Sequence, residues 1–371
     1  INPDVVAAYP ITPATEIVQI FAGYVADGLV DTEFVPVESE HSAMSACIGA
    51  SAAGGRTMTG TSSQGLALMA EMLYIASGLR LPIVMADVNR ALSSPINIHC
   101  DHSDTMMVKD AGWIQIFSEN VQEAYDNMIQ AVRIAEEALL PVIVTTDGFI
   151  ISHCMERMEL IDDKDVKNFV GEKKLGNYLL NIDKPITLGA LDLPDYYFEH
   201  KRQHIEAMIE SKDIILNVAK EFNSSFGRSY DLFETYKLED ADCAIVLMGS
   251  TAGTAKAVAD NLREKGIKAG VLGLRVFRPF PKEEIAQALK SIKAIAVMDR
   301  SDSMNAQEGP VCLEVKASLF DASAKKDVLN YIYGLGGREV RIEDIESVYK
   351  DLGEIIKGKS KNKVTYLGVR E

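Results

Sequence analysis

Cysteine and tryptophan are scarce in this sequence, with five of the first and one of the second among 371 residues. The cysteines lie far apart, and no pair has the C-x-x-C spacing. This excludes a zinc ribbon, and it excludes an iron–sulfur cluster held by this chain alone. An odd number of isolated cysteines favours reduced thiols, so we expect a cytoplasmic protein.

Long apolar runs and an excess of positive charge are also missing. No run approaches the roughly eighteen apolar residues that cross a bilayer, so we expect a soluble protein without a membrane segment. The formal net charge of -16 argues against nucleic acid and against an anionic membrane as a partner. The first residues, INPDVV, include neither a methionine nor a basic targeting region. We therefore expect no signal peptide and a longer natural N-terminus.

What the sequence does have is a regular alternation of short apolar runs and amphipathic stretches. Strands are predicted at 32–38, 56–62, 81–88 and 141–148, and helices at 40–55, 64–79 and 119–137. Strands separated by helices of this length predict βαβ units and a parallel sheet. We therefore predict an α/β fold whose first domain is a doubly wound parallel sheet.

Composition divides the chain into three segments. Residues 1–151 are predicted to form the core of the first domain. Residues 152–241 are richer in charge and are interpreted as a crossover or linker with a long helix that belongs to that domain. A smaller α/β domain is predicted over 242–371, with one strand at 268–277 and the final strand near 326–337.

The stretch YPITPATE places two prolines around one threonine. Each proline fixes its own φ and disfavours helical backbone for the residue before it, so Thr12 is biased toward extended geometry. The simpler interpretation is a rigid helix entry, with Thr12 as the N-cap and Glu16 completing a capping box. A second interpretation is that Thr12 also presents its hydroxyl and nearby N–H groups to an anion.

Glycine-containing stretches give little support to other enzyme classes. GASAAGG and GSTAGTA match neither G-x-G-x-x-G nor a P-loop, and G-x-S-x-G does not occur. Small residues on a helix commonly just allow it to pack closely against a sheet. The motifs therefore argue against a nucleotide-binding protein and against a serine hydrolase.

Glu40 directly follows a predicted strand and opens a helix rich in small residues. A carboxylate in the first turn of a helix is favoured by the helix dipole, so a capping role is the plain interpretation. The surrounding pattern, VESEHSAMSACIGASAAGGRTMTG, resembles something more specific. It is similar to the pyrimidine-binding domain of thiamine-diphosphate enzymes, whose helix begins with one glutamate.

The resemblance covers nearly the whole chain in the same order. The stretches that carry it are AAYPITPATE, VESEHSAMSACIGASAAGGRTMTGTSSQGLALM, VNRALSSPINIHCDHSD, DAGWIQIFSENVQEAYD, LLPVIVTTDGFIISH and LRVFRPFP. Together they resemble the alpha subunit of the 2-oxoacid:ferredoxin oxidoreductases, most closely the pyruvate branch. The leading GNEA-type helix of the family is absent from these residues. The resemblance implies a pyrimidine-binding domain followed by a smaller domain like the C-terminal domain of transketolase.

The resemblance also implies roles for particular residues. In thiamine enzymes the glutamate hydrogen-bonds a ring nitrogen of the aminopyrimidine and favours its imino form, and this requires desolvation. We therefore expect Glu40 to be catalytic and buried. The other residues expected to bind the cofactor are Pro10, Ile11, Ser63 and Gln64.

Arg90 is the residue expected to bind the substrate carboxylate. It follows the strand at 81–88, at the sheet edge where ligands bind in open α/β folds. A guanidinium offers two parallel donors to the carboxylate of a 2-oxoacid, although without the resemblance a surface arginine is the simpler interpretation. Thr12 would hydrogen-bond the substrate's oxygen atoms. Its two prolines would hold it in place, because a displacement of about 1 Å near a reacting centre can cost roughly a hundredfold in rate.

The loop SSPINIHCDHSD raises the question of a metal. Its polar residues are His99, Asp101, His102 and Asp104. Their spacing on an irregular segment favours a hydrogen-bonded loop wall over a ligand set. No residue of this chain is predicted to bind a metal.

Parts of the implied active site are missing from this sequence. There is no G-D-G of the kind that holds Mg²⁺ and a diphosphate, and the cysteine spacing cannot hold a cluster. We therefore expect thiamine diphosphate to be shared with a beta subunit that carries the diphosphate and Mg²⁺ site. Ferredoxin-like gamma and delta subunits would hold [4Fe-4S] clusters and pass electrons to ferredoxin, with CoA as co-substrate. Glu40 would then meet the cofactor across a subunit interface.

The expected reaction is the oxidative decarboxylation of pyruvate to acetyl-CoA and CO2. One alternative is the same scaffold acting on 2-oxoisovalerate, 2-oxoglutarate, indolepyruvate or oxalate, although dianionic oxalate would want a second cation beside Arg90. The other is a non-catalytic α/β assembly protein. The sequence leaves open which 2-oxoacid is used, the direction of the reaction and the number of subunits.

Overall fold

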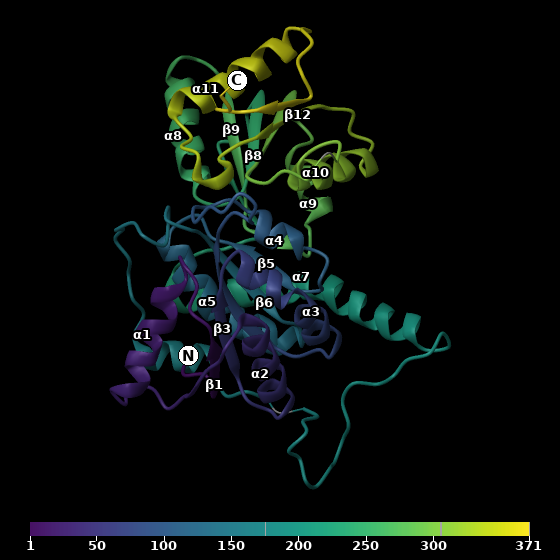
Figure 1. Ribbon diagram of the computed structural model, residues 1–371. Coiled ribbons are helices and arrows are strands. Elements are labelled where there is room, and N and C mark those ends of the chain that lie inside the picture. Colours follow the sequence, from purple (N-terminus) through teal and green to yellow (C-terminus); the bar gives the residue numbers. More distant parts are fainter. Residues whose placement is uncertain (175, 305, 371) are drawn as a thin grey trace.

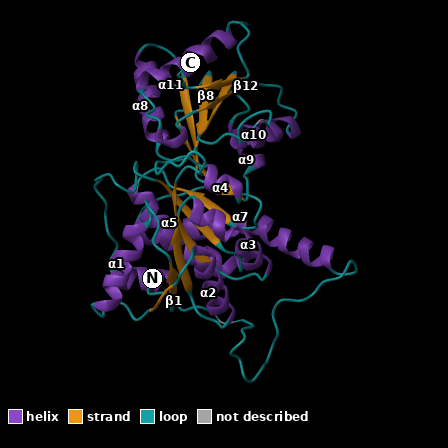
Figure 2. Ribbon diagram, viewed as in Figure 1, coloured by secondary structure: helices purple, strands orange, loops and turns teal. Residues whose placement is uncertain are grey.

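Two sheets, each covered by helices, make up the molecule (Figure 1). The computed structural model describes residues 1–174, 176–304 and 306–370. Figure 2 shows the two sheets stacked end to end, with the N-terminal part of the chain in one and the C-terminal part in the other. None of the helices in these ranges combines the length and the apolar character that a bilayer-spanning helix needs.

The first sheet has seven strands among the described residues, in the order β10-β5-β6-β4-β3-β1-β2. They are parallel except for β10, which is antiparallel to β5. The strands are β1 (Val5–Ala8), β2 (Glu33–Pro36), β3 (Thr57–Thr61), β4 (Ile83–Asn89), β5 (Ile114–Phe117), β6 (Val142–Asp147) and β10 (Val276–Arg278). The helices are α1 (Thr15–Ala26), α2 (Glu40–Ala52), α3 (Gln64–Gly78), α4 (Ser103–Met107), α5 (Val121–Ala138), α6 (Asp163–Val170) and α7 (Tyr197–Phe226).

Both faces of this sheet are buried. Successive residues of a strand point to opposite faces. In β4, Ile83 and Met85 pack with α2 and α3, whereas Val84 packs with α5 and α7. Burial on both sides explains why the strands read as near-continuous apolar runs. The predicted parallel sheet with helices on both faces is confirmed.

The second sheet repeats this construction with six strands in the described part of the chain, ordered β13-β12-β11-β8-β9-β7. Only β7 is antiparallel to its neighbour. The strands are β7 (Phe233–Tyr236), β8 (Cys243–Leu247), β9 (Ala269–Leu274), β11 (Ala294–Asp299), β12 (Asp327–Ile332) and β13 (Val364–Tyr366). The helices are α8 (Thr251–Glu264), α9 (Lys282–Ala288), α10 (Pro310–Asp321), the 3₁₀ turn η1 (Leu335–Gly337) and α11 (Ile342–Ile356).

The segment between the two blocks contributes to both of them. The helix α7 packs along α5, and its residues Ile215, Val218 and Phe222 are fully buried in the core of the first domain. The strand β7 then adds an edge to the second sheet. The charged residues of α7 lie on its exposed face, and its opposite face belongs to the core. The charged composition of this segment therefore does not show that the helix lies outside the core.

The prediction of one strand at 268–277 was wrong, because the chain changes sheets at Arg275. The strand β9 stays in the second sheet, whereas β10 crosses to pair with β5. Arg275 is buried, and its Nε donates to Oδ1 of Asn127 in α5 at 2.9 Å. Its carbonyl accepts the N–H of Phe117 at 2.7 Å. These partners hold the chain against the first domain, and the local apolar pattern does not predict them.

The prediction that the final strand lies near 326–337 was also wrong. The strand β12 is followed by α11 and by β13, which pairs with β12 at the sheet edge. Ile345, Val348 and Leu352 of α11 are fully buried, at the spacing of one helix face. This 3.6-residue period was present in the sequence and was overlooked.

The predicted N-cap at Thr12 was wrong as well. Helix α1 begins at Thr15 with Ala14 as its N-cap, and no side chain caps it. The N–H of Ala14 donates to the carbonyl of Ile11 at 2.7 Å, so a separate turn precedes the helix. Thr12 lies within this turn, where its side chain is exposed rather than used for capping.

Residues 176–196, which precede α7, contain no helix or strand, and Figure 1 shows this segment extending away from the body of the molecule. Its apolar side chains include Leu180, Ile182 and Leu191, which are 69%, 90% and 90% exposed. Exposed coil of this kind is the preferred target of proteases.

We expect thermolysin, which cleaves before large apolar residues, to cut the isolated chain first within 178–193. Mass spectrometry of the earliest fragments identifies the site. Replacing Leu180, Ile182 and Leu191 together by serine should delay this first cut without changing cleavage elsewhere. First cuts within α2, α5 or α8 would contradict the expectation.

Candidate active site

The predicted site residues gather at one edge of the first sheet. Thr12 follows β1, and Glu40 follows β2. Ser63 comes two residues after the end of β3, and Arg90 comes directly after β4. All four lie at the carboxyl ends of parallel strands, where open α/β sheets bind ligands. The second domain lies over this edge (Figure 1).

Glu40 is the first residue of α2 and is only 6% exposed. Ser39 caps the helix by accepting the N–H of Ser42 at 3.2 Å, so the Glu40 side chain is not needed as a cap. Within residues 1–174, 176–304 and 306–370, its carboxylate has no hydrogen-bond or salt-bridge partner. Burying a carboxylate is costly unless a donor reaches it, and only the helix dipole favours it here. The expected burial is confirmed, and the carboxylate is free to bind an external donor.

Gly65 shapes the space beside this carboxylate. A Cβ at this position would lie 2.7 Å from Oε1 of Glu40 and 2.4 Å from Oγ1 of Thr61. The Thr61 hydroxyl is itself buried without a partner in the described part of the chain. Only glycine lets α3 approach so closely. The Glu40 carboxylate and the unsatisfied Thr61 hydroxyl therefore both border the backbone of Gly65. An unsatisfied buried hydroxyl in a native structure needs an explanation, such as a ligand or a water molecule that binds it.

Substituting Gly65 by alanine is expected to displace the Glu40 carboxylate. The overpacked contact should cost about 1–3 kcal/mol of unfolding free energy and weaken thiamine diphosphate binding. Urea unfolding and calorimetry on the assembled complex measure the two effects. Gly78→Ala in the same helix is the matched control, because nothing lies within 4 Å of a Cβ there. If the two variants had the same unfolding free energy and the same affinity for thiamine diphosphate, the close packing of Gly65 against Glu40 would not matter as proposed.

Ser63 and Gln64 form the turn between β3 and α3. Ser63 is fully buried and has a φ of 50°, in the left-handed region that a serine rarely adopts. Its hydroxyl lies 2.6 Å from the carbonyl oxygen of Ala91 and 2.8 Å from Oε1 of Gln64. Its N–H donates to Oδ2 of Asp104 at 3.0 Å. Strained backbone held by external bonds is typical of functional turns.

Arg90 is 7% exposed and braces the turn after β1. Its Nη1 donates to the carbonyl of Thr12 at 2.9 Å, and its Nε donates to the carbonyl of Asn97 at 2.8 Å. Burial lowers the pKa of Arg90, and the nearby Asp104 carboxylate partly opposes this. Nη2 makes no hydrogen bond within the described ranges, so one donor of the fork stays available.

The structure therefore brings Arg90 and Thr12 together, through the main chain of Thr12. Pro10 and the Thr12 side chain are exposed, and Ile11 is half-buried. In the proposed site these three residues would form the outer rim, and the buried Ser63 and Glu40 would form the floor. Gln64 is half-buried beside Ser63.

A buried ion pair joins the two domains behind this site. Oδ2 of Asp147, at the end of β6, accepts Nη1 of Arg300 at 2.6 Å and the Ser250 hydroxyl at 2.5 Å. Its Oδ1 lies 2.8 Å from Nε2 of His102. Burial alone would raise the pKa of Asp147, but Arg300 and His102 outweigh it and hold that pKa well below its usual range. Asp147 and Arg300 were not among the residues predicted from the sequence, although each is a charged residue at or just after the end of an apolar run.

Cys100, His102 and Asp147 lie within 4.8 Å of one another, close enough to consider a metal site. Asp147 already neutralises Arg300, however, and burial raises the pKa of the Cys100 thiol well above its usual range. A protonated thiol beside an ion pair does not favour a cation. The loop forms the predicted hydrogen-bonded wall, in which Asp101 accepts the N–H groups of Ser103 and Gly336.

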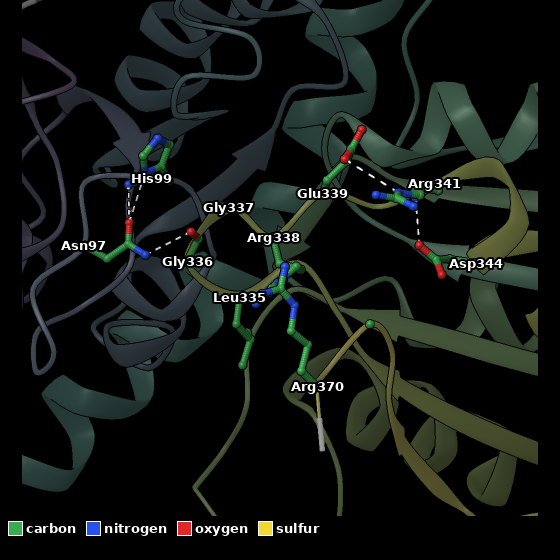
Figure 3. A pocket seen from close by; sticks show the side chains of 11 residues that line it. Asn97, His99, Leu335, Gly336, Gly337, Arg338, Glu339, Arg341, Asp344 and Arg370 are labelled. Carbon is green, nitrogen blue, oxygen red and sulfur yellow. Dashed lines mark hydrogen bonds and ion pairs between the residues drawn. The ribbon is translucent and has the colours of Figure 1, made fainter.

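A cavity of about 650 Å³ opens where this loop meets the second domain (Figure 3). Asn97 and His99 line one side, and the turn after β12 lines the other. Nδ2 of Asn97 donates to the carbonyl of Gly336 at 2.9 Å (Figure 3). Because the Asn97 carbonyl also accepts from Arg90, the position of Arg90 depends on both domains.

Comparison with known families agrees with this geometry. The family described as pyruvate flavodoxin/ferredoxin oxidoreductase, thiamine diphosphate-binding, matches residues 1–220. The family described as pyruvate:ferredoxin oxidoreductase core domain II matches residues 241–345. The first match alone covers more than half of the chain, and the two follow each other in the predicted order.

Individual relatives support the same assignment. Over 100% of its length, the chain is 54% identical to pyruvate synthase subunit PorA of Thermotoga maritima, covering 94% of that protein. It is 49% identical to the PorA of Methanocaldococcus jannaschii, over 93% of this chain and 89% of that one. It is also 44% identical to ketoisovalerate oxidoreductase subunit VorA of Pyrococcus horikoshii, over 95% of this chain and 89% of that one.

Solved structures confirm the fold. The chain matches the 2-oxoglutarate:ferredoxin oxidoreductase of Magnetococcus marinus with a TM-score of 0.69 at 22% identity, covering 94% of this chain and 62% of that one. A split-gene transketolase matches with a TM-score of 0.51 at 12% identity, over 96% of this chain and 91% of that one. The expected fold of a thiamine-type domain followed by a transketolase-like domain is confirmed. The chain belongs to the pyruvate flavodoxin/ferredoxin oxidoreductase family and is an alpha subunit of the 2-oxoacid:ferredoxin oxidoreductase type.

Proposed function

We propose that this chain supplies the pyrimidine side of a thiamine diphosphate site in an enzyme that oxidatively decarboxylates pyruvate to acetyl-CoA and CO2. The observation that carries the proposal is the carboxylate of Glu40, which is buried beside Gly65 and Thr61 and has no hydrogen-bond partner among the residues that the structure describes. Such a carboxylate is suited to accept a charge-assisted hydrogen bond from a protonated ring nitrogen. When bound, thiamine diphosphate supplies the carbanion chemistry of its thiazolium ring.

Glu40 would hold a proton at the aminopyrimidine ring nitrogen and so select the imino form. Ser63 and Gln64 would line the same pocket at the start of α3. Pro10 and Ile11 would frame the cofactor from the rim. Their assignment is supported by their place at the carboxyl edge of the sheet.

Arg90 would bind the carboxylate of the 2-oxoacid through its remaining donor, and the Thr12 hydroxyl would contact the substrate's oxygen atoms. Within the described ranges, one cationic side chain, that of Arg90, hydrogen-bonds the turn at Thr12. A site with one such cation favours a monocarboxylate with a small tail over a dianionic substrate. This supports pyruvate over oxalate and 2-oxoglutarate.

The remaining parts of the enzyme are assigned to partner chains. We infer a beta subunit that holds Mg²⁺ and the diphosphate, and ferredoxin-like gamma and delta subunits that hold [4Fe-4S] clusters and reduce ferredoxin. The five cysteines of this chain are free and separate, which suits a reducing cytoplasm and leaves cluster binding to partners. CoA would enter as the co-substrate that accepts the acetyl group.

A second candidate substrate is 2-oxoisovalerate, because a VorA relative is 44% identical over 95% of the chain. The test is ferredoxin reduction by the purified complex with pyruvate, 2-oxoisovalerate, 2-oxoglutarate and oxalate in turn. We expect the highest kcat/KM for pyruvate and dependence on thiamine diphosphate. A preference for 2-oxoisovalerate would replace the substrate assignment. No reduction with any of the four, although the partner subunits are present, would favour an assembly protein.

A further inference from the structure

Asp104 is a fully buried carboxylate that the proposed reaction does not use directly. Its Oδ2 accepts the backbone N–H groups of Ser63 at 3.0 Å and Arg90 at 2.8 Å. Its Oδ1 accepts Nδ2 of Asn89 at 2.9 Å and the N–H of Thr105 at 2.8 Å. Each oxygen therefore receives two N–H donors, and the whole carboxylate is satisfied by acceptance alone.

Two of these four bonds reach opposite sides of the proposed active site. Ser63 leads into α3, whose Gly65 lies against Glu40 on the cofactor side. Arg90 carries the guanidinium on the substrate side. We propose that Asp104 is a positioning residue that fixes the cofactor side and the substrate side relative to each other, through the backbones of Ser63 and Arg90. The inference rests on the proposed function, because it assumes these two roles.

The turn at Ser63 explains why an external acceptor is needed there. An L-residue at a φ of 50° is held in a sparsely populated conformation, which the surroundings must stabilise. The Ser63 side chain contributes through its contact with Ala91, and the N–H contributes through Asp104. Without the second bond, the start of α3 would be free to relax and move Gly65 away from its contact with Glu40.

The four donors also require that Asp104 be ionised. Burial raises the pKa of Asp104 to about 6, although the bonds from Arg90, Asn89, Ser63 and Thr105 oppose this. Burial and the adjacent Asp104 charge raise the pKa of Asp87 well above its usual range, so Asp87 is the neutral member of the pair. The charged or titratable groups around Asp104 are Asp87 on β4, Arg90 after β4, and Cys100, Asp101 and His102 in the segment before α4.

Protonation of Asp104 would turn one acceptor site of the carboxylate into a donor. We therefore expect all four hydrogen bonds to form above pH about 6 and at least one of them to be lost below it. An asparagine at position 104 would have the same defect at every pH. Whichever way its amide turns, the NH2 group faces two N–H donors.

The test compares Asp104→Asn with two reference variants in the assembled enzyme at pH 8. Calorimetry measures binding of thiamine diphosphate and of oxamate, an unreactive analogue of pyruvate. Asp104→Asn should weaken both by about tenfold to a hundredfold, as expected for loss of a hydrogen bond to a charged group. Arg90→Ala should weaken oxamate alone. Asp87→Asn is the matched control, because Asp87 is equally buried but, among the described residues, hydrogen-bonds only Asn89 through its side chain, and this change should weaken neither.

Binding of both ligands by Asp104→Asn as tightly as by the wild type would overturn the proposal. If Arg90→Ala also leaves oxamate binding unchanged, the proposed substrate site fails instead. Should Asp104→Asn not assemble, the wild-type pH series decides: the KM for pyruvate must rise as pH falls from 7 to 5, with a midpoint near 6. The same rise must persist in Asp87→Asn, and a flat wild-type profile would refute the positioning role.

Discussion

Replacing Glu40 by glutamine is expected to lower kcat for pyruvate by about 10²- to 10⁴-fold at saturating substrate and cofactor, the range of a lost general acid–base group. Glutamine keeps the shape of the side chain but cannot carry the negative charge that, in the proposed role, would hold a proton on the ring nitrogen. The bond to the cofactor therefore loses its charge-assisted character. Steady-state ferredoxin reduction gives kcat, and NMR of deuterium exchange at the reactive carbon of thiamine diphosphate isolates the proton-removal step.

Glu38→Gln is the matched control for this experiment. Glu38 lies two residues earlier, is exposed, and accepts the Ser42 hydroxyl at 2.7 Å. The same change of charge should there leave kcat unaltered. Wild-type turnover by Glu40→Gln would remove the basis for the assigned role of Glu40.

Replacing Arg90 by alanine is expected to act mainly on substrate capture. The KM for pyruvate should rise about tenfold to a hundredfold with a smaller change in kcat, because a hydrogen bond to a charged group is worth about 1.5–3 kcal/mol. Initial rates over a range of pyruvate concentrations separate the two parameters. The variant also releases the carbonyls of Thr12 and Asn97, so its thermal midpoint should be recorded alongside.

Arg90→Lys distinguishes the charge from the geometry of the guanidinium. Lysine keeps the positive charge but offers no planar fork, so its single nitrogen cannot reproduce the separate contacts that Nε and Nη1 make with the two carbonyls. Its KM should therefore lie between those of the wild type and the alanine variant. An unchanged KM in both variants would show that the substrate carboxylate binds elsewhere.

Much of the first domain could be predicted from the sequence because the signals are local. The helix that starts at Glu40 and the strand before Arg90 have periodicity and boundary residues within a few positions. Positions at the carboxyl ends of parallel strands follow from such elements. This is why Glu40 and Arg90 were placed at the correct edge of the sheet, whereas the boundary at Thr12 was not, because a turn bonded at Ile11 competed with the cap.

The contacts that organise the site could not be predicted in this way. Asp147 and Arg300 are 153 positions apart, and Arg275 bonds Asn127 across 148 positions. No periodic pattern relates such pairs. Asp104 was recognised only as one polar residue of a loop, because three of its four donors, from Ser63, Asn89 and Arg90, lie after β3 and at the end of β4 and meet it only after folding.

The sequence by itself determined the α/β class, the main strands and helices of the first domain, and the residues Glu40 and Arg90 that follow two of its strands, since these depend on propensity and periodicity over short windows. Only the tertiary structure decided that β10 returns to the first sheet, that Asp147 and Arg300 join the domains, and that Asp104 links Ser63 to Arg90. The physical reason is that the burial and pairing of polar groups depend on which distant surfaces come together. The pattern of neighbouring residues in the sequence does not determine which surfaces these are.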